Sequence, residues 1–298
     1  MHKSGFVNII GRPNAGKSTL MNALVGERMS IITAKPQTTR HRIIGLLSGD
    51  DFQIVFSDTP GIIKDPAYRM QEVMNRFVNT TYEDADIMLF VAGMDEQYTA
   101  DDPVVAQLKQ MEAPVFLVLN KMDTSNQQEV LARISQWREW VDFAEVFPIS
   151  ALHQQGTDGM LKAIIAALPE GPAYYPKDQL TDRPERFFVS EIIREKIMEN
   201  YHQEIPYSVE VVVESFKETQ TNKGEDIIRI SATIYVMRPT QKSIIIGKGG
   251  QSIKELGTAS RTALETFLEN KVFLELHVKV RENWRDDEQW LKRFGYSV

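Results

Sequence analysis

The 298-residue sequence contains no cysteine, which excludes disulfide scaffolds, thiol nucleophiles and cysteine-ligated zinc or iron–sulfur centres. It has no apolar run near the roughly 20 residues that a membrane-spanning helix needs. The best candidates, residues 87–92 and 115–119, have the length of strands. The N-terminus leads into a strand-like segment without the layout of a signal peptide. A net charge of −7 excludes a uniformly basic nucleic-acid coat, so we expect a soluble, cytoplasmic protein.

Length and apolar content predict two folded domains. The chain is about twice as long as the ~150 residues of a typical domain, and its hydrophobic fraction of 42% is near the globular average. Prolines at 169, 172, 176 and 184 mark a linker between two patterned halves. We predict one domain over residues 1–169, a linker over 170–184 and a second domain over 185–298.

The first domain alternates short apolar runs with helical patterns, which predicts a doubly wound, mostly parallel sheet of the α/β class. A short turn at residues 48–51 joins two of the strands in a hairpin, so we expect one antiparallel strand at an edge. The predicted strands are 6–10, 42–47, 52–57, 87–92, 115–119 and 146–149, and the predicted helices are 17–26, 68–82, 103–111, 126–141 and 157–168.

The second domain has a different order, helix–strand–strand–helix–helix–strand, which is a smaller α+β arrangement. Two long alternating runs joined by a Thr-Asn-Lys-Gly turn predict a hairpin, and the apolar run 243–246 predicts a further short strand. The predicted helices are 186–202, a pair across 251–270 and 286–295, and the predicted strands are 207–217, 227–237, 243–246 and 272–281.

Residues 11–18 match the pattern G-x-x-x-x-G-K-[ST] and lie between a predicted strand and a predicted helix. In that setting backbone N–H groups wrap a phosphate, and the helix N-terminus adds its positive dipole end. Lys17 would reach the β- and γ-phosphates as a catalytic group, and the Ser18 hydroxyl would ligate Mg²⁺. The predicted phosphate-binding residues are Gly11, Arg12, Pro13, Asn14, Ala15, Gly16, Lys17, Ser18 and Thr19.

The segment Asp-Thr-Pro-Gly at 58–61 follows a predicted strand, which places Asp58 at the sheet edge where open α/β sheets bind ligands. There Asp58 can hold Mg²⁺, usually through water, and the Gly61 N–H can reach the γ-phosphate. The loop 33–42 offers Thr38 or Thr39 as a second Mg²⁺ ligand, and we favour Thr39, in a loop that orders on the γ-phosphate. Predicted nucleotide contacts are Asp58, Thr59, Pro60, Gly61 and Ile62; Thr39 and Gly61 are assigned to catalysis, and Ser18, Thr39 and Asp58 to the metal.

Residues 120–123, Asn-Lys-Met-Asp, close another predicted strand and indicate a guanine site. A carboxylate at Asp123 accepts hydrogen bonds from the ring N1–H and the exocyclic NH₂ of guanine, which adenine cannot donate together. A base that leaves such a buried group unpaired is strongly rejected. The predicted base contacts are Asn120, Lys121, Met122 and Asp123, with Ser150, Ala151 and Leu152 offering a backbone N–H to the guanine O6.

A glycine loop in the second domain, Gly-Lys-Gly-Gly at 247–250, precedes an amphipathic helix and indicates RNA binding. Small residues let phosphates approach the helix N-terminus, and the lysine adds a charge partner. Residues 238–281 carry eight Lys and Arg against four acids, a modest basic segment in an acidic protein. The predicted RNA contacts are Ile246, Gly247, Lys248, Gly249, Gly250, Gln251, Lys242 and Lys254.

Together with Gln37–His41, the nucleotide motifs resemble those of the TrmE–Era–Der class of translation-factor-related GTPases, and the glycine loop resembles the GXXG loop of a KH domain. With residues 191–196 and the ending 278–296, the whole chain is similar to one family of that class. The resemblance implies a P-loop GTPase domain over 1–169 and a KH-type domain over 185–298, with GTP, GDP and Mg²⁺ as ligands. It implies binding to 16S ribosomal RNA near its 3′ end on the small (30S) ribosomal subunit, a role in subunit maturation and weak association with the inner membrane. We expect no DNA partner and a monomer.

One position departs from many small GTPases, which place a glutamine after D-x-x-G to orient the attacking water. This sequence has Ile62, whose aliphatic side chain cannot hydrogen-bond to water. Slow intrinsic turnover is therefore implied, and for loops of the Asn14 type the resemblance implies help from a bound K⁺.

Two alternatives stay open at this point. The chain could be an RNA-binding module whose nucleotide pocket barely turns over, as Ile62 suggests. It could also be a GTPase of tRNA modification or of a membrane process, with the RNA domain as a tether.

Overall fold

The computed structural model describes residues 1–33, 35–63 and 65–296. Ala34 of the predicted loop and the last two residues of the predicted second domain therefore lie outside the described part. The chain forms two compact units. Unit 1 comprises Met1–Asp65 and Met74–Asp182, and unit 2 comprises Pro66–Val73 and Arg183–Val298.

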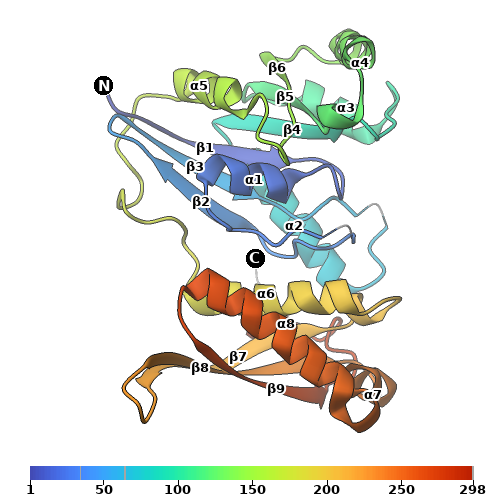
Figure 1. The fold of residues 1–298 in the computed structure, drawn as a ribbon. Helices are drawn as coiled ribbons and strands as arrows, with labels where there is room; N and C mark the ends of the chain where they lie inside the picture. The colour runs from blue at the N-terminus through green and yellow to red at the C-terminus, as the bar shows by residue number, and fades with distance from the viewer. Residues whose placement is uncertain (34, 64, 297–298) are drawn as a thin grey trace. The chain divides into compact units, whose positions relative to one another are not determined.

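Unit 1 contains a six-stranded sheet with the order β2-β3-β1-β4-β5-β6 (Figure 1). β2 pairs with β3 antiparallel, and the other neighbours pair parallel, as the hairpin and the apolar runs predicted. β4 is buried along its whole length because helices cover both faces of the sheet. The strands are β1 (Lys3–Ile10), β2 (Ile43–Ser48), β3 (Phe52–Asp58), β4 (Ile87–Gly93), β5 (Val115–Asn120) and β6 (Glu145–Pro148).

Local signals set where the helices of this part of the chain begin. Asp102 caps α3, whose first residue is Pro103, and its side chain accepts from the Val104 N–H. Asn126 and Glu129 form a capping box at the start of α4. The helices are α1 (Lys17–Val25), α2 (Arg69–Glu83), α3 (Pro103–Lys109), α4 (Gln127–Trp140) and α5 (Thr157–Ala167), all close to the predicted ranges.

The predicted linker runs along the β2–β3 hairpin of unit 1. The Gln53 side chain accepts from the backbone N–H groups of Tyr174 and Tyr175 at 2.7 and 2.9 Å. Leu46 of β2 donates its N–H to the carbonyl of Leu180 at 2.8 Å. The Leu46 bond occupies part of the free edge of β2, which would otherwise present unpaired backbone groups.

Unit 2 has a three-stranded sheet, β7-β8-β9, with α6 and α8 packed on one face (Figure 1). β7 and β8 are antiparallel, and β8 and β9 are parallel. No helix in the described part of the chain is both long and apolar enough to cross a bilayer. The elements are α6 (Glu185–Asn200), β7 (Glu210–Gln220), β8 (Asp226–Val236), α7 (Pro239–Ile246), α8 (Gln251–Leu268), β9 (Val272–Val280) and α9 (Glu288–Arg293).

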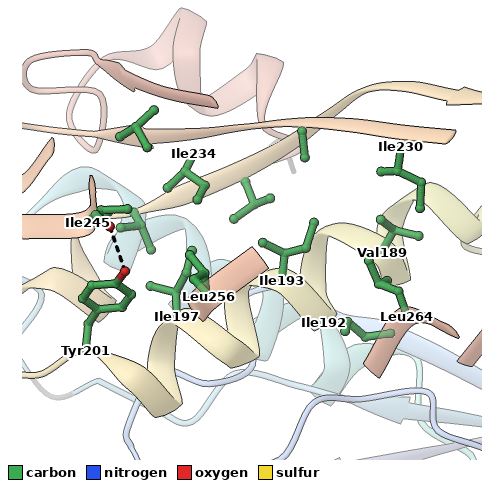
Figure 2. Packing of buried hydrophobic residues seen from close by; sticks show 14 of the residues in the cluster. Val189, Ile192, Ile193, Ile197, Tyr201, Ile230, Ile234, Ile245, Leu256 and Leu264 are labelled. Carbon is green, nitrogen blue, oxygen red and sulfur yellow. Dashed lines mark hydrogen bonds between the residues drawn. The ribbon is translucent and has the colours of Figure 1, made fainter. Parts of the chain in front are cut away.

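The core of unit 2 is formed by aliphatic side chains that alternate along β8 and recur at helical spacing on α6 and α8 (Figure 2). Ile193 of α6, Ile234 of β8 and Leu256 of α8 are all essentially inaccessible to solvent. The hydroxyl of Tyr201 donates to the carbonyl of Ile245 at 2.9 Å, which connects the end of α6 to α7 (Figure 2).

The predicted strand at residues 243–246 is wrong, because these residues form the last turn of α7. Pro239 occupies the first turn of this helix, where its fixed φ and missing N–H are tolerated. The Gln241 side chain accepts from the N–H groups of Met237 and Arg238 at 2.9 and 3.0 Å, which satisfies the helix start. These start signals outweigh the β propensity of three consecutive isoleucines.

Candidate functional site

The phosphate-binding loop of unit 1 connects β1 to α1 and requires glycine at its last turn. Gly16 has a φ of 97°, a conformation that L-residues rarely adopt. A Cβ at this position would lie 2.1 Å from the amide nitrogen of Asn120. The loop therefore packs directly against the Asn-Lys-Met-Asp segment, and its backbone can approach a ligand closely.

Lys17 is buried at the start of α1 and is held by carbonyls of its own loop. Its Nζ donates to the carbonyls of Gly11 and Arg12 at 3.0 and 2.9 Å. Burial lowers the pKa of Lys17, while the charges of Asp58 and Glu96 act in the opposite direction. A polyanionic phosphate would supply the negative charge that favours the ammonium form.

Three oxygen-bearing side chains converge beside Lys17. Ser18 Oγ donates to Asp58 Oδ2 at 2.6 Å, and Thr39 Oγ1 lies 2.9 Å from Ser18 Oγ and 3.4 Å from the same carboxylate oxygen. Asp58 Oδ1 is buried and has no hydrogen-bond partner among the described residues. One carboxylate, two hydroxyls and an unpaired buried oxygen fit Mg²⁺, which prefers hard oxygen ligands and keeps several of its waters.

The two candidate threonines point to different partners. Thr38 Oγ1 donates to the carbonyl of Lys35 at 2.6 Å and lies 2.7 Å from Thr33 Oγ1. Thr39 Oγ1, by contrast, donates to Asp58 Oδ2 at 3.4 Å. The geometry supports the assignment of Thr39 to the metal.

Burial is the main reason that the pKa of Asp58 is raised above 3.8, and Lys17 and Ser18 only partly oppose it. A protonated carboxyl cannot ligate Mg²⁺. On acidification Asp58 should therefore lose the metal at a higher pH than an exposed aspartate would, and with it the metal's contribution to nucleotide affinity. We expect the Mg²⁺ enhancement of GDP affinity to disappear as the pH falls through this raised pKa. Titrations with Mg²⁺ between pH 5 and 8 measure it, and an equal pH profile for Asp58→Asn would contradict the prediction.

The segment after Asp58 is packed tightly on the phosphate-binding loop. A Cβ on Gly61 would lie 2.7 Å from Pro13, so glycine permits the close approach. Asn75 of α2 accepts from the Ile63 N–H at 3.0 Å and donates to the Ile63 carbonyl at 2.8 Å. The backbone next to Ile62 is thus held by Asn75, a residue that the motif pattern did not single out.

The guanine motif is organised by Asn120. Its amide donates to the carbonyl of Ala15 at 2.9 Å, and its oxygen accepts from the Ala151 N–H at 2.9 Å. One side chain therefore joins the phosphate loop, the Asn-Lys-Met-Asp segment and the Ser-Ala-Leu segment. The carboxylate of Asp123 remains 25% exposed, and a hydrogen bond from Ser150 is the main reason that its pKa is lowered.

Residues of all five nucleotide motifs line one cavity of about 530 Å³, a volume within the range of small-molecule sites. Asp95 also lines it and was missed at the sequence level. Its carboxylate pairs with Lys121 Nζ at 2.8 and 3.1 Å. Asp95 lies two residues after β4, and Asp58 ends β3 at the same carboxyl edge of the sheet, so its position near a strand end was the signal that could have found it.

The glycine loop of unit 2 lies between α7 and α8. Gly247, Gly249 and Gly250 have φ values of 72°, 62° and 79°. A Cβ on Gly247 would lie 2.2 Å from Ser252 Oγ, whereas Gly249 and Gly250 border open space. Lys248 and Lys254 are exposed beside the N-terminus of α8.

A separate groove of about 330 Å³ lies between α8 and β9. It combines apolar walls with two cations, a composition suited to nucleobases flanked by phosphates. The residues that line the groove are Ile253, Lys254, Gly257, Thr258, Arg261, Leu274 and Leu276. Of these only Lys254 was predicted, because the groove forms only when α8 packs on β9.

Two known protein families match separate parts of the chain. The family described as 50S ribosome-binding GTPase matches residues 6–121, and the KH domain family matches residues 204–285. The chain is 46% identical to GTPase Era of Syntrophus aciditrophicus (strain SB), covering 100% of this chain and 96% of that protein. It is also 46% identical to the chloroplastic GTPase ERA1 of Zea mays, covering 99% of this chain and 71% of that protein.

Two solved structures match nearly the whole chain at 37% identity. An Aquifex aeolicus Era variant bound to GDP·AlF4⁻ has a TM-score of 0.92 and covers 99% of this chain and 100% of its own. A complex of Era with MgGDPNP and nucleotides 1506–1542 of 16S ribosomal RNA has a TM-score of 0.93 and covers 100% of both chains.

Proposed function

This chain belongs to the Era family of GTPases, and from that premise we propose that it binds the 3′ end of 16S ribosomal RNA through unit 2 under the control of GTP. It hydrolyses GTP to GDP and phosphate with Mg²⁺. We further propose that GTP hydrolysis controls the release of the RNA during assembly of the small ribosomal subunit.

The observation that carries the proposal is the glycine loop together with the α8–β9 groove. Gly249 and Gly250 leave open space in front of the α8 N-terminus, and exposed Lys248 adds a cation. This arrangement suits the phosphates of a single strand, and the α8–β9 groove suits its bases.

The chain also offers a route for control by the nucleotide. Gly61, which we expect to contact the γ-phosphate, precedes the segment Pro66–Val73 by a few residues in the chain, and that segment belongs to unit 2. Within unit 2 the Arg285 guanidinium lies 3.9 Å from the Tyr68 ring centre, and Arg69 pairs with Glu288 at 3.0 Å. A shift of Gly61 on GTP binding would therefore be passed along the backbone to residues anchored in the RNA-binding unit.

The test measures binding of an RNA with the sequence of nucleotides 1506–1542, by fluorescence anisotropy with GDPNP or GDP bound. We expect binding at least about ten-fold tighter with GDPNP, within the usual range of allosteric coupling. Equal affinities would exclude the switch. Tighter binding of tRNA than of this RNA would favour the alternative function in tRNA modification.

Two further features remain proposals. We infer peripheral association with the membrane only from the family resemblance. We also infer K⁺ assistance near Asn14, which has a φ of 66° in the phosphate-binding loop.

A further inference from the structure

The side chain of Arg12 leaves the phosphate-binding loop and contacts three residues of the segment that joins β4 to α3. Its Nη1 donates to the carbonyl of Gln97 at 2.7 Å. Its Nη2 forms an ion pair with the carboxylate of Asp102. Its guanidinium carbon lies 3.9 Å from the ring centre of Tyr98. We call this set of contacts the Arg12 clamp.

Each contact uses a different property of arginine. The carbonyl bond uses the donor fork, the ion pair uses the charge, and the ring contact uses the flat guanidinium face. Lysine has neither the fork nor the face. The three partners therefore specify arginine at position 12, although a phosphate-binding loop needs no particular side chain there.

The partners of Arg12 are themselves held in place. Tyr98 is 4% exposed and packs against Phe90 and Trp137 in the core of unit 1. Asp102 is the N-cap of α3, so its carboxylate is held by the helix start. The clamp thus fixes Arg12 to a rigid part of the protein.

The backbone of the clamped residue also holds the catalytic lysine. The carbonyl of Arg12 accepts from Lys17 Nζ at 2.9 Å. A chain of contacts thus runs from α3 through Asp102 and Arg12 to Lys17. Loosening Arg12 would move an acceptor that sets where the ammonium stands relative to the phosphates.

We propose that Arg12 is a positioning residue for GTP hydrolysis, which acts through the clamp to place Lys17 at the β- and γ-phosphates. Loss of the Arg12 side chain is therefore expected to lower kcat more than it changes KM. Many backbone N–H groups share the binding of the ground state, whereas charge that develops during phosphoryl transfer depends on the exact place of Lys17.

The test is steady-state GTP hydrolysis with Mg²⁺ and K⁺ and without RNA. Arg12→Met keeps the aliphatic stem and removes the guanidinium. We expect kcat to fall about ten-fold, as for a small misplacement of a catalytic group, with KM changing less than about three-fold. Asp102→Asn, which keeps an acceptor for the α3 cap, should lower kcat in the same way. The double variant should be no slower than Arg12→Met, because Asp102 acts through the guanidinium that Arg12→Met has already removed.

The control is Arg138→Met, the same change at an exposed arginine of α4. It should leave both constants unchanged. A kcat of Arg12→Met within two-fold of the unmodified protein, a loss confined to KM, or additive effects in the double variant would overturn the proposal. Melting with saturating GDP identifies a variant that does not fold, and Asp102→Asn then serves as the test. Because this assay contains no RNA, its outcome is independent of whether unit 2 binds 16S ribosomal RNA as proposed above.

Discussion

Replacing Asp123 by asparagine is expected to weaken GTP binding by about a hundred-fold or more, because two hydrogen bonds to a charged acceptor are lost at about 1.5–3 kcal/mol each. The lowered pKa of Asp123 keeps its carboxylate ionised at neutral pH, so both guanine donors meet a charged acceptor. Asparagine presents an NH₂ donor to one of them, which turns an attraction into a repulsion. Calorimetric titration with GTP and GDP measures the loss.

The same variant should gain affinity for xanthosine triphosphate, whose ring carries a carbonyl where guanine has its NH₂. The new carbonyl accepts from the asparagine amide, so the complementarity is restored with the opposite polarity. Asp142→Asn, which changes an exposed carboxylate after α4, is the matched control and should bind GTP normally. Unchanged GTP affinity in Asp123→Asn would show that the base lies elsewhere.

Placing an aspartate at Gly249 is expected to weaken RNA binding by about a hundred-fold, since like charges forced together at an interface cost several kcal/mol. Gly249 has a φ of 62° and no atom within 4 Å of the position of a Cβ. Aspartate tolerates this backbone conformation better than most residues. The fold should therefore survive, and the carboxylate would face the RNA phosphates. Anisotropy with the 16S ribosomal RNA segment measures the effect.

Gly249→Asn separates charge from shape, because asparagine has nearly the same size and tolerates the same backbone conformation. It should retain most of the RNA affinity. GTP hydrolysis without RNA should be unchanged in both variants, because unit 1 contains the nucleotide motifs. Equal losses in Gly249→Asp and Gly249→Asn would mean that bulk, not charge, blocks the loop. Gly247 is unsuitable for this test because any Cβ would collide with Ser252.

Sequence patterns were most informative where one segment carries both its structure and its chemistry. Asp58 and Asn120 end buried strands, and parallel strands bring their carboxyl ends to one edge. The order of the motifs along the chain therefore predicted the nucleotide cavity. The pattern failed at residues 243–246, where three isoleucines fit either a strand or a buried helix and the helix start decided the outcome.

Other features depend on contacts between distant parts of the chain. Arg12 meets Asp102 only because β1 and β4 are neighbours in the sheet, and Asn75 reaches Ile63 only through the placement of α2. The choice between Thr38 and Thr39 depends on how the loop folds against Asp58.

The amino-acid sequence by itself determined the two-part architecture, the guanine and phosphate motifs and the glycine loop. Backbone preferences and hydrophobic periodicity act within a few residues and can be read directly. Only the tertiary structure decided which side chains support them: the clamp on Arg12, the carbonyls around Lys17 and the groove between α8 and β9. Those contacts join segments far apart in the chain, and their geometry is set by how the helices and strands pack.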